Sequence, residues 1–336
     1  MLVNSLHIRI LKWARNFCIG GIIGFLILLA MGFVYERLAE YSDSRKYPPP
    51  GNIVEINGHK MHIYTEGSGD STVVFASGFG IPCPYTDFYP LYSEISRHAK
   101  IVVYEKPGYG WSEVSADSRD INTIVQELHE LLGKSDQKPP YILVGHSLAS
   151  LEIIRFAQLY GDEVKGIVTI DAGNPEFYAT ETLSDSALSS LRLKSILNNL
   201  GVFRLLFNYS PNFYSAVYAP RNNLALVPEE LREIDKAMYL KNMVNKDKTD
   251  EVNNMKANAA TVVREGSLQN IPLRILTSEA EVTNEKWRTS QVAFKDWSSD
   301  STQTIMPGTN HNMHQYIPDK IIAEIISLLH GYSRPY

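Results

Sequence analysis

The chain has 336 residues, enough for one large domain or two, and 44% of them are hydrophobic, as is typical of a globular protein. Its formal net charge of −5 offers no basic surface to a nucleic-acid backbone, which argues against nucleic acid as a partner. The two cysteines, Cys18 and Cys83, lie far apart and show no metal-ligand spacing, so they predict neither a disulfide nor a metal site.

The first feature along the chain is an apolar run without a charged residue, FCIGGIIGFLILLAMGFVY, at residues 17–35. As a helix it would be about 28 Å long, close to the roughly 30 Å hydrocarbon core of a bilayer. Basic residues gather before the run and are sparse directly after it; the flanking ones are Arg9, Lys12, Arg15 and Arg37. This bias predicts a single-pass membrane protein with its N-terminus in the cytoplasm and the remaining chain on the other side.

Residues 1–35 are therefore predicted to form a cytoplasmic N-terminus and a transmembrane anchor, and a cleaved signal peptide is the alternative. The cleavage site would be Ala30-Met31-Gly32, which fits the small-x-small pattern poorly, so we favour the anchor. Residues 36–51 are charged and polar and end in YPPPG, where three prolines predict a short, stiff linker.

After this linker, apolar strands alternate with helices. Residues 51–67 predict a hairpin whose turn is Asn57-Gly58. Further strands are predicted within 71–80, 100–112, 141–146, 164–171, 271–278 and 301–308, and amphipathic helices within 121–133 and 319–331. This alternation is typical of an α/β fold with a mostly parallel central sheet and helices on both faces. The core is assigned to residues 52–171 and 271–336.

The interval 172–270 interrupts this alternation, because it contains no convincing strand and has the periodicity of helices. We expect a helical cap, or lid, that lies over the carboxyl ends of the strands. Its aromatic residues predict an apolar roof above a binding pocket; they are Phe177, Tyr178, Phe203, Phe207, Tyr209, Phe213, Tyr214 and Tyr218.

A serine occupies the boundary between a buried strand and a helix, in the sequence Gly145-His146-Ser147-Leu148-Ala149. A sharp strand-turn-helix lifts a serine out of the sheet, points the helix N-terminus at it and makes the next backbone N–H, that of Leu148, a donor to an oxyanion. The alternative is a serine that caps an ordinary helix. The strand before it and the helix after it favour the nucleophile.

From Gly51 to its end the chain resembles the α/β-hydrolase superfamily, whose nucleophile motif is G-x-S-x-G. Ala149 replaces the last glycine, and we expect its small methyl group to be tolerated. The resemblance implies that the turn ASGFG, residues 76–80, provides a second oxyanion donor, the backbone N–H of Phe79. Ser77 stands there in place of the family's usual histidine, which a backbone donor does not require.

The resemblance also implies a catalytic base in the segment GTNHNMHQYIPDK, after the last predicted strand. The family pattern is a turn with glycine, the histidine, and a proline seven residues later. His311 and Pro318 fit this pattern, so His311 is the expected base and His314 a neighbour.

The acid that would orient the histidine has more than one candidate. Asp171 ends the strand VKGIVTID, and the segment IDAGNPEF resembles a subgroup of predicted hydrolases with their acid at that position. The usual position in the superfamily is the later loop TSEAEVTNEKW, which contains Glu279 and Glu281. We favour Asp171, with Glu281 next; a turn-forming role for Asp171 is the non-catalytic alternative.

A serine, a histidine and a carboxylate carry out acyl transfer through an acyl-enzyme. The resemblance therefore implies a serine esterase acting on a hydrophobic or lipid-like small-molecule ester, without a cofactor. A peptidase, thioesterase, amidase or acyltransferase is possible with the same residues, and the serine argues against epoxide hydrolase chemistry. A catalytically silent, membrane-anchored binding protein is the alternative of another class, although Ser147 and His311 are both present. The oligomeric state is left open.

The turn YEKPGYGWSE, with Glu105 and Lys106, is interpreted as structural.

Overall fold

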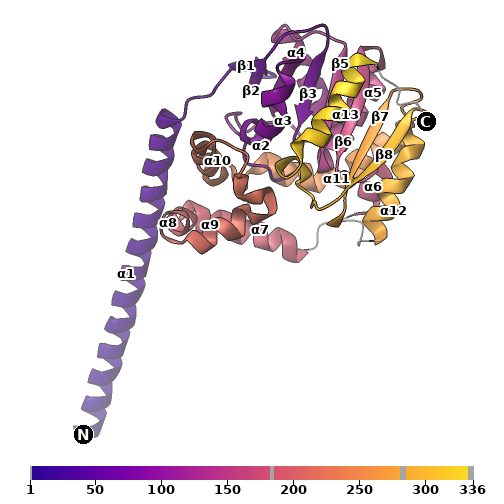
Figure 1. Cartoon of the computed structure of the whole chain (residues 1–336). Helices are drawn as coiled ribbons and strands as arrows, with labels where there is room; N and C mark the ends of the chain where they lie inside the picture. The colour runs from indigo at the N-terminus through magenta and orange to yellow at the C-terminus, as the bar shows by residue number, and fades with distance from the viewer. Residues whose placement is uncertain (1, 182–184, 281–284, 332–336) are drawn as a thin grey trace.

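A computed structural model describes residues 2–181, 185–280 and 285–331 (Figure 1). Its strands form one eight-stranded sheet in the order β1-β2-β4-β3-β5-β6-β7-β8. Their bounds are β1 Asn52–Ile56, β2 His59–Glu66, β3 Thr72–Ala76, β4 Lys100–Glu105, β5 Tyr141–His146, β6 Val164–Ile170, β7 Leu273–Ser278 and β8 Ser301–Met306. Strand β2 pairs antiparallel with β1 and β4, and the other neighbours pair in parallel. The sheet is therefore mixed, although most of its pairings are parallel as expected.

Helices cover both faces of this sheet, because its central strands are apolar on both sides. In β3, for example, Val74 and Ala76 belong to one buried cluster and Val73 and Phe75 to the other. The first cluster packs under α4 (Ile121–Lys134), α5 (Ser150–Leu159) and α11 (Lys246–Glu265). The second packs under α3 (Tyr89–Ile95) and α13 (Pro318–His330). This three-layer arrangement makes the carboxyl ends of the parallel strands one common edge.

Local signals explain where these helices begin and end. The side chain of Asp120 accepts hydrogen bonds from Asn122 N and Thr123 N, at 3.2 and 3.1 Å, and so caps the N-terminus of α4. Gly133 was the expected stop of this helix, but α4 continues one residue further, to Lys134. Helix α13 ends at His330 and is capped by Gly331, whose φ of +69° is accessible to glycine without strain.

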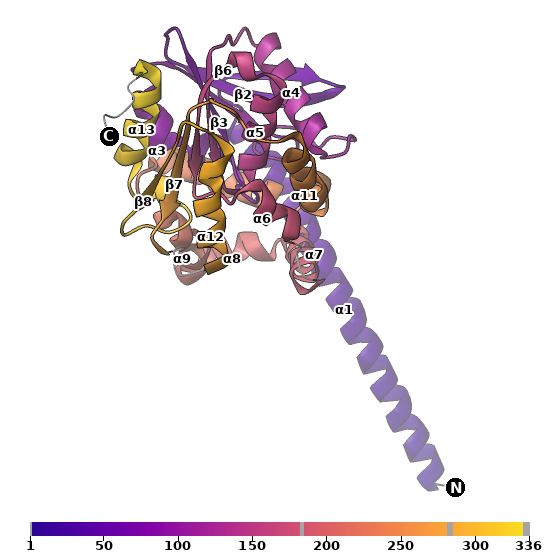
Figure 2. The same ribbon diagram turned by 90° about the vertical axis from the view of Figure 1, so that its right-hand side faces the viewer.

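Between β6 and β7 the described residues form helices joined by turns and loops, and no strand. They are α6 (Pro175–Thr180), α7 (Asp185–Asn199), α8 (Val202–Tyr209), α9 (Pro211–Tyr218), the 3-10 segment η3 (Ala219–Leu224), α10 (Glu229–Asn242) and α11. The two ends of the insertion, α6 and α11, contribute to the cluster beneath the sheet. Figure 2 shows α7, α8 and α9 on the side where α1 extends away.

The aromatic residues of the insertion have a different role from the one expected. Phe203, Phe207 and Tyr218 pack with Leu224 and Leu240 into a buried cluster that belongs to the cap alone. They therefore form the core of the cap rather than the roof of a pocket. Phe177 and Tyr178 differ, because they pack against the cluster of the sheet.

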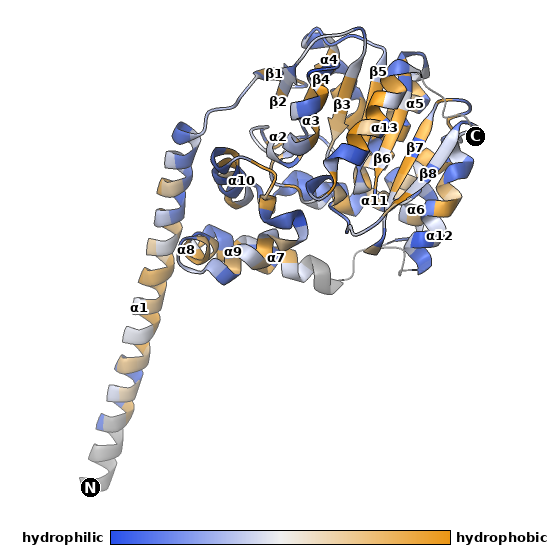
Figure 3. Ribbon diagram, in the orientation of Figure 1, coloured by the Kyte–Doolittle hydropathy of each residue, from blue (hydrophilic) through white to orange (hydrophobic). Residues whose placement is uncertain are grey.

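Helix α1 runs without a break from Leu2 to Lys46, so most of the expected linker is helical and only residues 47–51 separate α1 from β1. Its polar end is stabilised by contacts with the cap, which a linker prediction from local composition could not include. The segment Leu11–Lys46 is long and apolar enough to cross a membrane, and its apolar part is exposed; a signal sequence would pass the same test. Figure 3 shows the apolar stretch along α1.

The turn after β4 has the structural role predicted for it. Glu105 accepts hydrogen bonds from Trp111 N at 2.7 Å, and its carboxylate lies 2.9 Å from His62 Nδ1. Lys106 Nζ binds Glu152 Oε1 at 2.5 Å and Glu251 Oε1 at 2.7 Å. All of these charged groups are buried, so the turn joins the sheet to α5 and α11.

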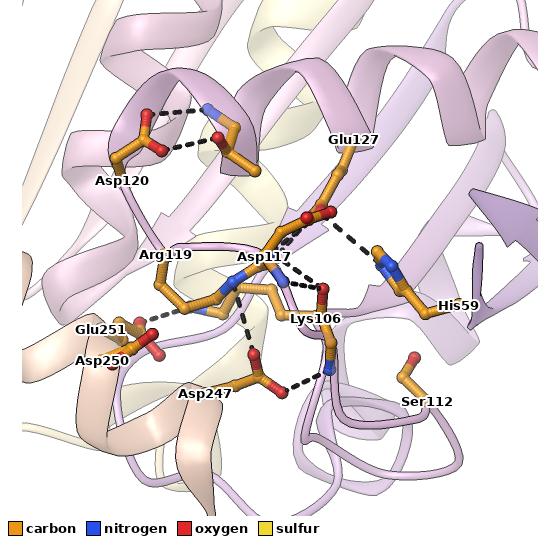
Figure 4. A network of polar contacts seen from close by, with 12 residues as sticks. His59, Lys106, Ser112, Asp117, Arg119, Asp120, Glu127, Asp247, Asp250 and Glu251 are labelled. Atoms are coloured by element: carbon orange, nitrogen blue, oxygen red, sulfur yellow. Dashed lines mark hydrogen bonds and ion pairs between the residues drawn. The ribbon is translucent and has the colours of Figure 1, made fainter. Parts of the chain in front are cut away.

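A second buried network joins the same region to α4 (Figure 4). Arg119 pairs in a bidentate manner with Glu127, at 2.7 and 2.9 Å, and its Nε lies 3.4 Å from Asp247 Oδ1. Asp247 also accepts a hydrogen bond from Ser115 N at 2.9 Å. Because Asp247 lies in the first turn of α11, the network holds the end of the insertion against the sheet.

Candidate functional site

Ser147 occupies the sharp turn between β5 and α5, in the 3-10 segment η1 (Ser147–Ala149). Its φ is +54°, a conformation that costs a non-glycine residue energy and is concentrated at functional sites. Two glycines, one before the serine in β5 and one in the loop after β3, leave room for this turn. A Cβ on Gly145 would lie 2.5 Å from Ile153 Cδ1, and one on Gly78 would lie 2.9 Å from Ser147 Cβ. Ala149 is fully buried in this turn.

Tyr178, at the start of the insertion, has its hydroxyl beside this turn. The hydroxyl accepts a hydrogen bond from Gly173 N at 3.3 Å. Burial raises the pKa of Tyr178, and hydrogen bonds from Gly173 and from the Ser147 side chain oppose this rise. Tyr178 was expected in the aromatic lid, and no sequence motif marks it as a neighbour of the serine.

Asp171 and His311 form a hydrogen-bonded pair. Their Oδ2 and Nδ1 atoms are 2.7 Å apart, and the other Asp171 oxygen accepts a hydrogen bond from Ser278 N at 2.9 Å. The carboxylate is completely buried, whereas the His311 side chain is 35% exposed. Asp171 follows β6 and Ser278 ends β7, so two neighbouring strand ends hold the acid in place. An imidazole held through Nδ1 presents Nε2 for proton transfer.

The loop that carries His311 reaches the serine turn. His146, the residue before Ser147, has its Nε2 3.0 Å from the backbone oxygen of His311, and the two ring centroids are 4.8 Å apart. The ring of Trp287 in α12 (Glu285–Ala293) lies edge-on to His311, with centroids 5.9 Å apart. The structure thus brings the three expected residues, Ser147, Asp171 and His311, to one edge of the sheet.

The other candidate acids have different positions. Glu279 is exposed and accepts a hydrogen bond from Gly308 N at 2.8 Å. Glu281 lies outside the described residues. Among the described carboxylates considered for this role, Asp171 is the one that binds His311.

The two expected oxyanion donors belong to the segments on either side of Ser147. Leu148 is the second residue of η1, directly after the serine. Phe79 follows Gly78, the glycine whose backbone contacts Ser147, and its side chain is half-buried against the cluster of the sheet. Both peptide groups therefore belong to segments that lie at the serine turn.

A buried charged network lies behind the histidines and was not expected from the sequence. His314 Nε2 lies 2.9 Å from Asp87 Oδ2, and Arg221 pairs with both Asp87 and Asp235 at 2.8 and 2.9 Å. Burial alone would raise the pKa of Asp87, but the charges of Arg221 and His314 outweigh it and hold that pKa below its usual range. Burial also lowers the pKa of His146, which favours its neutral form. Because Arg221 and Asp235 come from the cap, no motif near the core could reveal them.

The cap also binds the backbone and side chains of the histidine loop directly. Asn222 Nδ2 donates to Gln315 O at 2.8 Å. Directly before and after His311, the Nδ2 atoms of Asn310 and Asn312 both donate to Pro220 O, at 3.2 Å. The segment η3 therefore contacts the loop before and after the candidate base.

Two groups of side chains have ligand atoms close enough to hold a metal ion: Asp87, His146 and His314, and His59, Asp117 and Glu127. In the first group, His314 already binds Asp87 and His146 binds the backbone of His311. In the second, Glu127 is already engaged by Arg119. Hydrogen bonds and ion pairs thus engage some of the ligand atoms, whereas His59 Nε2, His146 Nδ1 and His314 Nδ1 are buried without a hydrogen-bond partner among the described residues.

The comparisons agree with this architecture. A family described as alpha/beta hydrolase fold matches residues 72–201. The uncharacterized protein YbdG of Bacillus subtilis (strain 168) is 33% identical over 306 residues, which cover 88% of this chain and 90% of YbdG. The chain belongs to the α/β-hydrolase superfamily. This α/β-hydrolase is also similar in fold to two solved structures, which cover the same 83% of it.

The first of these structures is a bromoperoxidase from Bacillus anthracis, with a TM-score of 0.63 and 18% identity over 99% of that chain. The second is a thermophilic esterase from Thermogutta terrifontis, with a TM-score of 0.57 and 16% identity over 96% of that chain. At these identities the likeness concerns the fold. What this α/β-hydrolase does must therefore be argued from its own residues.

Proposed function

We propose that this protein is a membrane-anchored serine hydrolase that cleaves a carboxylic ester through an acyl-enzyme. Ser147 would attack the carbonyl carbon, and His311 would take the serine proton and then give it to the leaving alcohol. Water would release the acyl group in a second step, with the same histidine as base. Asp171 would hold the imidazole and stabilise its charged form.

The observation that carries this proposal is the hydrogen bond between His311 Nδ1 and the buried carboxylate of Asp171, beside a serine with positive φ. Both features cost folding free energy. Burying the carboxylate removes it from water, and the positive φ strains the backbone of the serine. Acyl transfer explains both at once. The amides of Leu148 and Phe79 would stabilise the oxyanion of the tetrahedral intermediate.

The surroundings of the serine favour a hydrophobic substrate. Leu148, Phe79, Tyr178 and Trp287 all pack within or against one apolar cluster beside it. An apolar wall with a few polar atoms suits the acyl or alkyl group of an ester better than a charged substrate. We therefore propose a lipid-like or otherwise hydrophobic small-molecule ester.

The apolar segment of α1 would anchor this domain in a membrane, and the basic residues before it would place the domain outside the cytoplasm. An anchored hydrolase meets substrates dissolved in or released from lipid at a high local concentration. This location supports the same substrate class.

A fluorophosphonate probe tests the nucleophile, because it reacts covalently with an activated serine. We expect the full chain to be labelled, Ser147→Ala to lose the labelling, and Ser135→Ala, a change at the remote end of α4, to keep it. Undiminished labelling of Ser147→Ala would refute the assignment. Product analysis of a short-chain ester with a competing alcohol then distinguishes hydrolysis from acyl transfer to an alcohol.

A further inference from the structure

Helix α1 and the cap contact each other at a defined height along α1. A Cβ on Gly32 would lie 2.4 Å from the backbone oxygen of Leu200, between α7 and α8, so the two backbones approach closely. Gly32 lies within the apolar run that ends at Tyr35. The contact is therefore about 5 Å from the end of this run, on its N-terminal side, at 1.5 Å per helical residue.

Charged and polar contacts fix the same position. Arg204 in α8 pairs in a bidentate manner with Glu36, at 2.9 Å for both bonds, and also binds Asp43 at 2.7 Å. Arg37 donates to Asn199 at 3.0 Å. Planar two-bond pairs of this kind constrain orientation as well as distance. Helices α7 and α8 are thus held beside the last turn of the apolar run and the first turns after it, as far as Asp43.

At this height, α7 and α8 expose large apolar side chains. Their exposed fractions are 57% for Leu193, 57% for Ile196, 47% for Leu205, 36% for Leu206 and 81% for Tyr209. The opposite side of α8, with Phe203 and Phe207, packs into the cap core. Figure 3 shows α7, α8 and α9 at the lower edge of the domain, beside the apolar part of α1 and away from the sheet. An apolar patch of this kind marks an interaction surface.

The charge of the segment points to the nature of the partner. From Ser186 to Pro228 the sequence contains no Asp or Glu, although the whole chain has more acidic than basic residues. Arg192 and Lys194 on α7 are exposed. Apolar side chains combined with basic ones and without acidic ones are typical of helices that lie in the interface of an anionic membrane.

We propose that α7 and α8 dock onto the phospholipid bilayer that α1 crosses, in the leaflet on the side of the hydrolase domain. This inference rests on the membrane anchor of the proposed function. If α1 crosses the membrane, the level of Gly32 is the boundary between acyl chains and headgroups. A helix of about 10–12 Å diameter held at that level immerses one side in the leaflet. Docking would present the cap, and the edge of the sheet above it, to molecules dissolved in lipid.

Site-specific fluorescence in vesicles tests this docking with the full chain. In a Cys18→Ser background, NBD is attached to Ile196→Cys or Leu205→Cys; the remaining native cysteine, Cys83, is completely buried. The vesicles contain phosphatidylcholine and phosphatidylglycerol, with and without doxyl-labelled lipid. We expect a blue-shifted emission and loss of most of the fluorescence when the doxyl group is near the headgroups.

Two controls separate the possible outcomes. Leu159, which is 40% exposed at the end of α5, lies beside the end of α11 and not on α7 or α8, so a label on Leu159→Cys should not be quenched. NBD on the native Cys18 reports the anchor and should be quenched by deeply placed doxyl groups.

Quenching at position 18 but not at 196 and 205 refutes docking and leaves the anchor intact, whereas no quenching at 18 refutes the anchor. A blue shift at 196 and 205 without quenching would indicate a second copy of the chain as the partner and would also refute docking. The serine assignment is tested separately by the fluorophosphonate probe.

Discussion

The sheet and the cap are held in place by different interactions. The sheet is built on two large apolar clusters, and its central strands have no exposed side chains. The two ends of the cap, α6 and α11, share the cluster of the sheet. Its middle part, from α7 to α10, has a small apolar cluster of its own, and arginines join it to the rest of the molecule: Arg221 pairs with Asp87 of the core, and Arg204 pairs with Glu36 of α1. Apolar packing tolerates many exchanges of similar volume, whereas a buried ion pair fails when one partner is lost.

This difference matters for the site because the candidate triad depends on both kinds of interaction. Ser147 and Asp171 follow neighbouring strands of the core, and their positions need no contribution from the cap beyond Tyr178. The loop of His311 lies between the core and η3 and is bound by both. Changes in the core should therefore abolish the chemistry, and changes in the cap should alter stability or the position of the base.

The largest effect is expected from Asp171→Asn, because asparagine preserves the shape but removes the charge that stabilises the protonated imidazole. We expect the turnover of a short-chain nitrophenyl ester to fall by about 10³–10⁴ without loss of folding. Glu279→Gln and Glu281→Gln are the matched controls and should retain most of their activity. Near-normal turnover of Asp171→Asn, with a collapse in either glutamine variant, would transfer the role to the later loop.

The next effect concerns the join between cap and core. Arg221→Met removes the cation that pairs with the buried carboxylates of Asp87 and Asp235, which should lower the free energy of unfolding by about 3–5 kcal/mol. Asp87 would keep its contact with His314, and Asp235 would keep the hydrogen bond from the Thr86 hydroxyl. Chemical denaturation of the purified full chain measures this, with the exposed Arg192→Met as control. Adding Asp87→Asn and Asp235→Asn to Arg221→Met should recover part of the loss, since the unpaired charges are then removed. No recovery would mean that packing of the arginine side chain matters more than its charge.

The sequence allowed the core to be predicted for the same reason that the core is robust. Strand and helix periodicities depend on which residues are apolar, and strands form within each of the predicted segments. The hairpin at Asn57-Gly58 is confirmed, and it explains the antiparallel part of the sheet. The pairing of Asp171 with His311 agrees with the preferred prediction, which depended on the resemblance of the segment IDAGNPEF to a subgroup of predicted hydrolases.

The cap could not be predicted in the same detail, because its position depends on pairs far apart in the sequence. Neither Glu36 nor Arg204 belongs to a motif. The polar composition of residues 36–46 predicts a linker, and only their contacts with the cap show why they are helical. The aromatic residues were assigned to a pocket because composition does not distinguish the core of a small domain from the wall of a site. Phe203 and Phe207 belong to the core of the cap, whereas Tyr178 packs in the cluster of the sheet.

The free energy of unfolding should depend on pH through Lys248 in α11, the last helix of the cap. Lys248 in α11 is completely buried, donates to Asn242 O at 2.5 Å, and burial lowers its pKa to about 7. In the unfolded chain its pKa is about 10.4, so between these values the unfolded state binds more protons and stability rises with pH. The cost of the buried charge is complete below pH 7 and disappears above about pH 10.

Lys248→Met removes this titration. Relative to the variant, the parent protein should lose about 2–4 kcal/mol of unfolding free energy as the pH falls from 10 to 7. Urea unfolding at both pH values measures the change. Lys246→Met, an exposed lysine of the same helix, should behave like the parent at each pH. Parallel stability curves for the parent and Lys248→Met would show that Lys248 stays charged in the fold.

The smallest effect is expected from Glu36→Gln, which weakens the join between α1 and the cap but keeps the size of the side chain. The glutamine can accept one hydrogen bond from Arg204, and Asp43 still pairs with Arg204. The free energy that holds the cap against α1 should therefore fall by about 1–2 kcal/mol. Amide hydrogen exchange of α7 and α8 should become faster by roughly five- to thirtyfold, and exchange of β5 and β6 should not change. Glu40→Gln, in an exposed pair with Arg37, is the control and should alter neither region. Equal acceleration in the sheet would mean that cap and core unfold as one unit, so that the two kinds of interaction identified here do not act independently.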